Sequence, residues 1–160
     1  MAMPGECARC GGASLAAAVV SEAMEVDGRT FVAELPAVRC EGCGETYLDL
    51  GTLGTFEKLV AAKLVELGAR SGAALRFMRK AIGMRAVDLA DLLDVAPETL
   101  SRWENDQREV DRGALMTVGS LVLDAVRGSS ATLDRLKALR APAPPSERVI
   151  IRLGSDQEAA

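Results

Sequence analysis

Hydrophobic residues recur at two different spacings along the chain, and the spacing changes near residue 56. Before that point, short stretches alternate between apolar and polar residues, as in residues 30–35, which is typical of strands joined by turns. Between Phe56 and Leu67 apolar residues recur every three or four positions, which predicts a helix, and Gly68 is placed to end it. We expect this helix to link the front of the chain to the rest of the protein.

Residues 73–139 predict five further helices, because apolar residues keep the helical spacing between short breaks. Gly83 and Gly128 are placed to end the first and the fourth. The marking residues, in chain order, are Leu75, Met78 and Ile82; Val87, Leu89, Ala90 and Leu93; Leu100 and Trp103; Leu115, Val118, Leu121, Val122 and Ala125; Leu133, Leu136 and Leu139. The fourth helix has a wide apolar face, which either completes the core or forms a dimer interface.

Together these patterns predict an α+β protein in three parts. Residues 1–68 form a small module of short antiparallel strands with the linking helix, and residues 69–140 form an all-α domain of five helices. Residues 141–160 form a tail that begins with a stiff, Pro-rich linker. Within it, residues 148–153 alternate like a strand that could pair with a partner or with the front module. A flexible terminus is the simpler expectation.

Composition narrows the classes of protein. Aromatic residues make up only 3% of the chain, so the core must be built from Leu, Val, Ala and Met. No apolar run approaches the roughly 20 residues that span a bilayer, and no signal peptide is visible, so we expect a cytoplasmic protein without a membrane partner. The chain has no histidine. Without histidine, a Gly-rich phosphate loop or a nucleophile–base pair, we expect that it is not an enzyme.

Charge is distributed unevenly along the chain. The formal net charge is −4, but residues 1–68 alone carry 5 basic and 10 acidic side chains, a net of −5. Residues 69–112 carry 8 of each and could present one basic face. We expect Arg76, Arg79 and Lys80 either to contribute to such a face or to be ordinary solvated charges.

Four cysteines in two pairs predict a metal site. Cys7, Cys10, Cys40 and Cys43 follow the pattern C-x2-C-x29-C-x2-C, and a glycine follows each pair. Two such turns can supply four thiolates in a tetrahedron around one structural Zn²⁺ per chain, and glycine permits the positive φ that points backbone N–H groups at sulfur. Disulfides would require export, and four thiolates leave no open position for catalysis. Cycling of the pairs as dithiols, in a redox sensor, is a further alternative.

Residues 84–104 predict two short helices that cross at a tight turn. Leu89, Ala90 and Leu93 face inward on the first helix, and Val95 fills the turn. Pro97 and Glu98 favour a helix start, and Leu100 and Trp103 anchor the second helix. Exposed residues at the N-terminal end of such a second helix meet base edges in the major groove of DNA. A generic helical hairpin with solvated polar residues is the alternative.

The motifs of both halves resemble known families. Residues 73–127, above all the stretch from Leu89 to Asn105, are similar to the Xre/Cro/C1 helix-turn-helix repressors. With the CARCG and CEGCG motifs in front, the order of motifs over residues 7–127 resembles the MqsA-type (YgiT-type) antitoxins. The resemblance implies a dimer that binds double-stranded DNA at a palindromic operator and often represses its own operon. In antitoxins of this type the zinc module also binds a toxin, usually an mRNA-cleaving ribonuclease.

The resemblance also assigns residues to DNA contacts. Arg102 matches the arginine that contacts bases, and Glu98 stands where the family usually has Asn or Gln, so the operator preference is expected to differ. Arg85 and Ala86 replace the usual Thr and Gln, so the expected phosphate contacts are Arg85, Ser101, Asn105 and Arg108. The expected DNA-binding residues are Arg85, Glu98, Thr99, Ser101, Arg102, Asn105 and Arg108.

Three functions remain open from the sequence. The first is a dimeric transcriptional repressor, and the second adds an antitoxin role in which the acidic module attracts a basic ribonuclease. A stand-alone Xre-type regulator without a toxin is the alternative to the second. A thiol or zinc redox sensor is the third.

Overall fold

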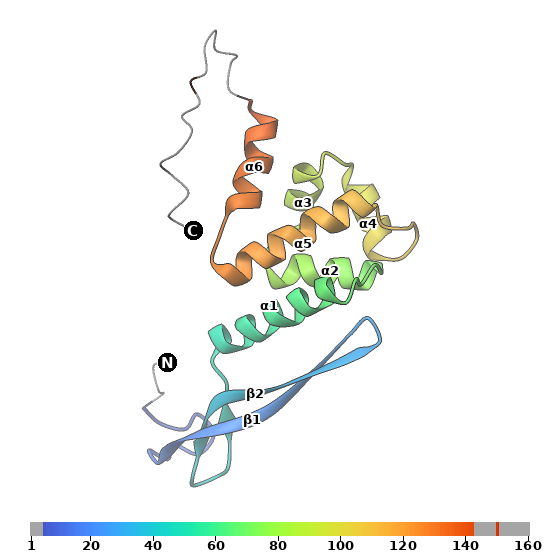
Figure 1. The fold of residues 1–160 in the computed structure, drawn as a ribbon. Helices are drawn as coiled ribbons and strands as arrows, with labels where there is room; N and C mark the ends of the chain where they lie inside the picture. The colour runs from blue at the N-terminus through green and yellow to red at the C-terminus, as the bar shows by residue number, and fades with distance from the viewer. Residues whose placement is uncertain (1–4, 143–149, 151–160) are drawn as a thin grey trace.

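A computed structural model of the chain describes residues 5–142 and residue 150, and it confirms the α+β class (Figure 1). A β-hairpin with a short third strand lies on one side of helix α1, and the remaining helices lie on the other side (Figure 1). The elements are β1 (Leu15–Val26), β2 (Arg29–Cys40), β3 (Thr46–Tyr47), α1 (Leu50–Glu66), α2 (Gly72–Ala81), α3 (Ala86–Leu92), α4 (Pro97–Glu104), α5 (Arg112–Arg127) and α6 (Ala131–Arg140).

The two long strands pair over their whole length. Strands β1 and β2 are each 12 residues long and run antiparallel, with Val26 opposite Arg29 and Leu15 opposite Cys40. They are longer than the short strands that the sequence indicates. In the turn between them Asp27 and Gly28 both have positive φ (55° and 68°), which matches the right-handed twist of the strands and lets them pair directly beside the turn.

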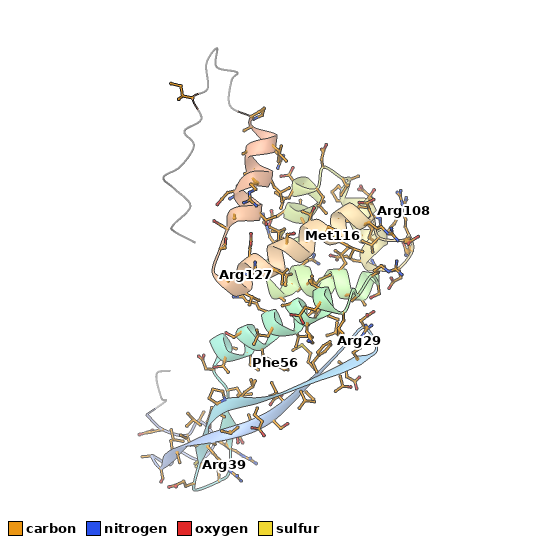
Figure 2. The ribbon with its side chains drawn as sticks, viewed as in Figure 1. Arg29, Arg39, Phe56, Arg108, Met116 and Arg127 are labelled. Carbon is orange, nitrogen blue, oxygen red and sulfur yellow. The ribbon has the colours of Figure 1, made fainter. Side chains whose placement is uncertain are left out.

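Helix α1 is shared between two cores. On the hairpin side, Phe56, Val60 and Leu64 pack with residues of β1 and β2, and Figure 2 shows Phe56 between α1 and the hairpin. On the other side, Ala61 and Ala62 belong to the core of the helical domain. The helix begins at Leu50, six residues before the apolar pattern begins, because the Asp49 carboxylate caps it through the backbone N–H of Thr52 at 3.0 Å.

The five helices expected after α1 are all present, as α2 to α6. Three glycines follow helix ends in the left-handed conformation, as the sequence predicts: Gly68, Gly83 and Gly128 have φ of 65°, 69° and 69°. The helical core contains side chains that are fully buried, including Leu75, Met78, Leu89, Leu100, Val118 and Val122. Val118 and Val122 of α5 therefore belong to this core, and Leu121 of the same helix is also buried.

The hairpin tip is attached to the start of α2. Ser71 is the N-cap of α2, where its hydroxyl accepts from the backbone N–H of Ala74 at 3.0 Å and donates to Asp27 Oδ1 at 2.5 Å. The next residue, Gly72, is packed so closely that a Cβ there would lie 1.9 Å from the carbonyl oxygen of Trp103. The start of α2 thus joins the hairpin, through Ser71, to the end of α4, through Gly72.

The strand expected at residues 148–153 lies outside the described residues, except for Ile150, which is exposed. Among the helices that the structure describes, none combines the length and the apolar character needed to cross a membrane.

Candidate metal centre and nucleic-acid interface

The two cysteine pairs form two turns with the same backbone hydrogen bonds. In the first turn the N–H of Gly11 donates to the carbonyl of Cys7 at 2.8 Å, and in the second the N–H of Gly44 donates to the carbonyl of Cys40 at 2.9 Å. Gly11 and Gly44 have φ of 71° and 75°, the positive values expected of the glycine after each pair. The first turn precedes β1 and the second follows β2, so the long hairpin itself brings the turns together.

The four sulfur atoms converge on one point. All four Sγ atoms lie within 4.8 Å of one another, and Cys7–Cys43 and Cys10–Cys40 are separated by 3.5 Å and 3.7 Å. A tetrahedron with Zn–S distances of about 2.3 Å places its sulfurs about 3.8 Å apart. The cluster can therefore bind a metal ion, and its dimensions fit tetrahedral coordination by four thiolates.

The surroundings of the cluster favour thiolates at some positions and not at others. The Tyr47 hydroxyl, 3.1 Å from Cys7 Sγ, lowers the pKa of Cys7 to about 6, and the backbone N–H groups of Cys10 and Arg9 act in the same direction. At Cys43 the backbone N–H of Glu45 lowers the pKa, but desolvation and the three neighbouring thiols raise it to about 12. Four thiols this close cannot all lose their protons without a cation between them.

The chain packs closely against the cluster at Gly12, where a Cβ would lie 3.3 Å from Cys10 Sγ. At Gly42 a Cβ would lie 3.8 Å from Cys40 Sγ, an ordinary contact distance. Outside the cluster, Arg9 forms an ion pair with Glu45 at 2.9 Å. The Glu45 carboxylate raises the pKa of Arg9, and the Cys43 and Cys7 sulfurs add to this shift, so Arg9 is placed to offset part of the negative charge of the thiolates.

Helices α3 and α4 form the predicted crossed pair. Leu89 and Ala90 of α3 and Leu100 and Trp103 of α4 are all at most 4% exposed, while Val95 packs at the edge of the same core. Pro97 occupies the first turn of α4, as expected, and no side chain caps its N-terminus. The pair is therefore fixed by its inner face, which leaves the outer face of α4 free for other contacts.

An ion pair inside the domain holds α4 against α2. Arg79 is 7% exposed, and its guanidinium donates to Glu104 through Nε at 2.5 Å and Nη2 at 2.9 Å, and to the carbonyl of Met84 at 2.7 Å. The sequence left open that Arg79 contributes to a basic surface, and the structure shows that it does not. Its partner is 25 residues away, so no local pattern could have identified the pair.

The outer face of α4 carries four of the residues expected to contact DNA. Glu98, Ser101 and Arg102 are exposed, and Thr99 is partly buried. Glu98, Ser101 and Arg102 line a shallow hollow together with Gln107, which is not among the contacts expected from the sequence. Gln107 lies three residues after the end of α4, and only the fold shows that it lies beside Arg102.

The remaining expected contacts lie around this face, and two are already bonded within the chain. Arg85 is exposed and forms a bidentate ion pair with Asp88, both bonds at 2.6 Å, which raises the pKa of Arg85. The Asn105 amide donates to the carbonyl of Ser101 at 2.7 Å. Arg108 is exposed in the loop after α4, and Figure 2 shows it at the opposite end of the molecule from Arg39, which directly precedes Cys40.

The crossed pair α3–α4 and its exposed outer face have the arrangement of a helix-turn-helix. Comparison with known families agrees: residues 75–116 match the model of a helix-turn-helix family, so this segment is a helix-turn-helix domain of Xre type. The match runs from α2 into α5 and supports a DNA-binding transcription regulator. Neither the curated proteins nor the solved structures contain a significant match to the chain.

Proposed function

We propose that the protein is a sequence-specific transcriptional repressor that binds a palindromic operator in the cytoplasm as a homodimer, with α4 in the major groove. The observation that carries the proposal is the exposed polar end of α4 on a helix pair fixed by its core and by the Arg79–Glu104 ion pair. Side chains on such a rigid helix lose little freedom when they bind bases.

The residues of this face have separate roles in the proposal. Arg102 donates to the O6 and N7 atoms of a guanine in a bidentate pair, and Glu98 accepts from the N4 amino group of a cytosine. Thr99 adds a hydroxyl beside them. Arg85, Ser101, Asn105 and Arg108 contact phosphates, which fixes the orientation of α4 without reading sequence. Arg85 exchanges Asp88 for a phosphate in the complex.

We infer that the metal is one structural Zn²⁺ per chain, held by Cys7, Cys10, Cys40 and Cys43. The spacing of the four sulfurs and the preference of Zn²⁺ for four thiolates in a closed tetrahedron support this assignment. A bound zinc would join the two cysteine turns and would have no open coordination position for catalysis. Metal analysis of protein purified without reducing agent tests it: about one zinc per chain is expected, whereas metal-free, oxidised protein would support a redox sensor.

Replacing Arg102 tests the DNA-reading face. Arg102→Ala is expected to weaken specific operator binding by about 1–3 kcal/mol and to relax sequence preference at one position, while the fold is kept because the side chain is exposed. The measurement is fluorescence anisotropy against operators selected from random DNA, with size-exclusion light scattering for the dimer. Arg127→Ala, an exposed arginine near the end of α5, is the control. Unchanged affinity in Arg102→Ala would refute the assignment of α4 as the reading helix.

The outer face of the hairpin favours a second role, in which the protein is an antitoxin and this face binds the toxin. Val19 and Val32 are 67% and 64% exposed there, and the exposed Glu25 and Glu34 lie on the same face. Such a face suits a basic ribonuclease with an apolar patch. Mass spectrometry of the untagged protein from its own cells distinguishes the roles. A stoichiometric basic partner is expected for an antitoxin, and the homodimer alone would indicate a stand-alone regulator.

A further inference from the structure

An apolar cavity lies where α1, α2 and α5 meet, and no residue of the cysteine cluster or of α4 lines it. Its volume is about 340 Å³, which falls within the range of small-molecule sites. Helices α1 and α5 touch at one crossing, where a Cβ at Gly119 would lie 3.2 Å from Val65 Cγ1. The cavity opens beyond this crossing, between the α1–α2 turn and the first two turns of α5.

The walls of the cavity are almost entirely apolar. Val65 from α1, Met78 from α2 and Leu115 and Met116 from α5 line it. Met116 is 72% exposed at the mouth, whereas Met78 is 2% exposed at the base. Methionine side chains adapt to the shape of a ligand, because they are unbranched and polarizable. These walls suit the unbranched hydrocarbon chain of a small ligand.

Two arginines stand at the opening. Arg70 in the α1–α2 turn and Arg112 in the first turn of α5 both line the cavity and are exposed. Within residues 5–142 neither forms an ion pair or a side-chain hydrogen bond with another residue. Asp111, which directly precedes Arg112, is the N-cap of α5 and accepts from the backbone N–H of Ala114 at 3.0 Å. The N-terminal dipole of α5, a helix of 16 residues, adds positive potential at the same place.

We propose that this cavity binds a small amphiphilic carboxylate, with its hydrocarbon chain among the methionines and its carboxylate between Arg70 and Arg112. The two arginines determine the head group of the ligand, because two guanidinium groups without an ion-pair partner at the mouth of an apolar cavity favour an anion. The site joins α1, which carries the hairpin, to α2 and α5 of the DNA-binding domain. Binding itself requires neither DNA nor a partner protein.

Methionine methyl NMR on the full-length, metal-loaded protein tests the site with decanoate as the probe, kept below its critical micelle concentration. Met78 and Met116 are expected to shift in a saturable way, while Met24 in the hairpin and Met84 before α3 keep their positions. Decanol has the same chain without the charge, and it is expected to bind at least tenfold more weakly. Equal binding of the two compounds, or equal shifts of all four methyl groups, would overturn the proposal.

Two variants with matched controls sharpen the test. Met116→Glu places a carboxylate at the mouth, and it is expected to weaken decanoate binding at least tenfold, while Val126→Glu, the same change on an exposed part of α5, leaves it unchanged. Arg70→Gln is expected to weaken decanoate and not decanol, with Arg127→Gln as its control. Sedimentation of the same variants measures their oligomeric state, because the alternative occupant of the cavity is a second copy of the chain. If Met116→Glu dissociates a dimer and no decanoate binds, the cavity is an interface between two copies and the ligand site is refuted.

Discussion

The metal module and the helical domain reach order by different means. In the helical domain, large apolar side chains such as Leu75, Leu100 and Val118 are fully buried. In the front module, the fully buried side chains include the two cysteines Cys7 and Cys40 themselves. Where the core is this small, a metal ion bound by the four cysteines would supply the stabilisation that apolar burial supplies elsewhere. We therefore expect loss of metal to destabilise mainly the front module and loss of packing to destabilise mainly the helical domain.

The separation is not complete, because α1 belongs to both cores and Ser71 bonds to Asp27 at the hairpin tip. The hairpin extends from the cysteine cluster at one end to the start of α2 at the other (Figure 1). Three changes, in order of expected effect, test how far the regions are independent.

Removing the metal should have the largest effect. Structural zinc in small domains has apparent binding energies of about 10–16 kcal/mol, so chelation or Cys40→Ser is expected to unfold the two cysteine turns. The helical domain should keep its protection, because its core contains no metal ligand. Hydrogen exchange resolved by peptide measures both regions, and re-addition of zinc to the chelated protein is the control. Equal loss of protection in α2 to α5 would show that the regions fold as one unit.

Removing Glu104 should affect the helical domain alone. Glu104→Gln leaves the guanidinium of Arg79 buried without a counter-charge, which is expected to lower the free energy of unfolding by about 3–5 kcal/mol. Urea denaturation followed by circular dichroism measures this change, and metal content should stay constant.

Glu109→Gln, at an exposed position after α4, is the matched control for Glu104→Gln. If both variants unfold at the same urea concentration, the Arg79–Glu104 pair does not hold α4 in place.

Cutting the link between the regions should have the smallest effect. Ser71→Ala removes the N-cap of α2 and the hydrogen bond to Asp27, at an expected cost of about 1 kcal/mol. Exchange at the hairpin tip should increase together with exchange in the first turn of α2. Ser130→Ala is the control, because Ser130 precedes α6 without capping it through its side chain. A hairpin tip that keeps its protection in Ser71→Ala would mean that the link carries no coupling.

The sequence predicted much of the helical domain and of the metal site, because their signals are local. Helix ends at Gly68, Gly83 and Gly128 depend on a positive φ that glycine adopts without strain. The Asp27-Gly28 turn is an equally local signal, and it marks the position of the hairpin and not the length of its strands.

By itself, then, the sequence determined which four cysteines form the cluster and which helix presents Arg102, since the spacing within each cysteine pair and the apolar periodicity extend over only a few residues. Only the tertiary structure decided that Arg79 is buried against Glu104, that Ser71 meets Asp27 and that Arg70 and Arg112 share one cavity. Arg79 and Glu104 are 25 positions apart, and Ser71 and Asp27 are 44 positions apart. Arg70 and Arg112 lie on different elements. Such contacts depend on how the helices and the hairpin pack together, and packing is a property of the whole chain.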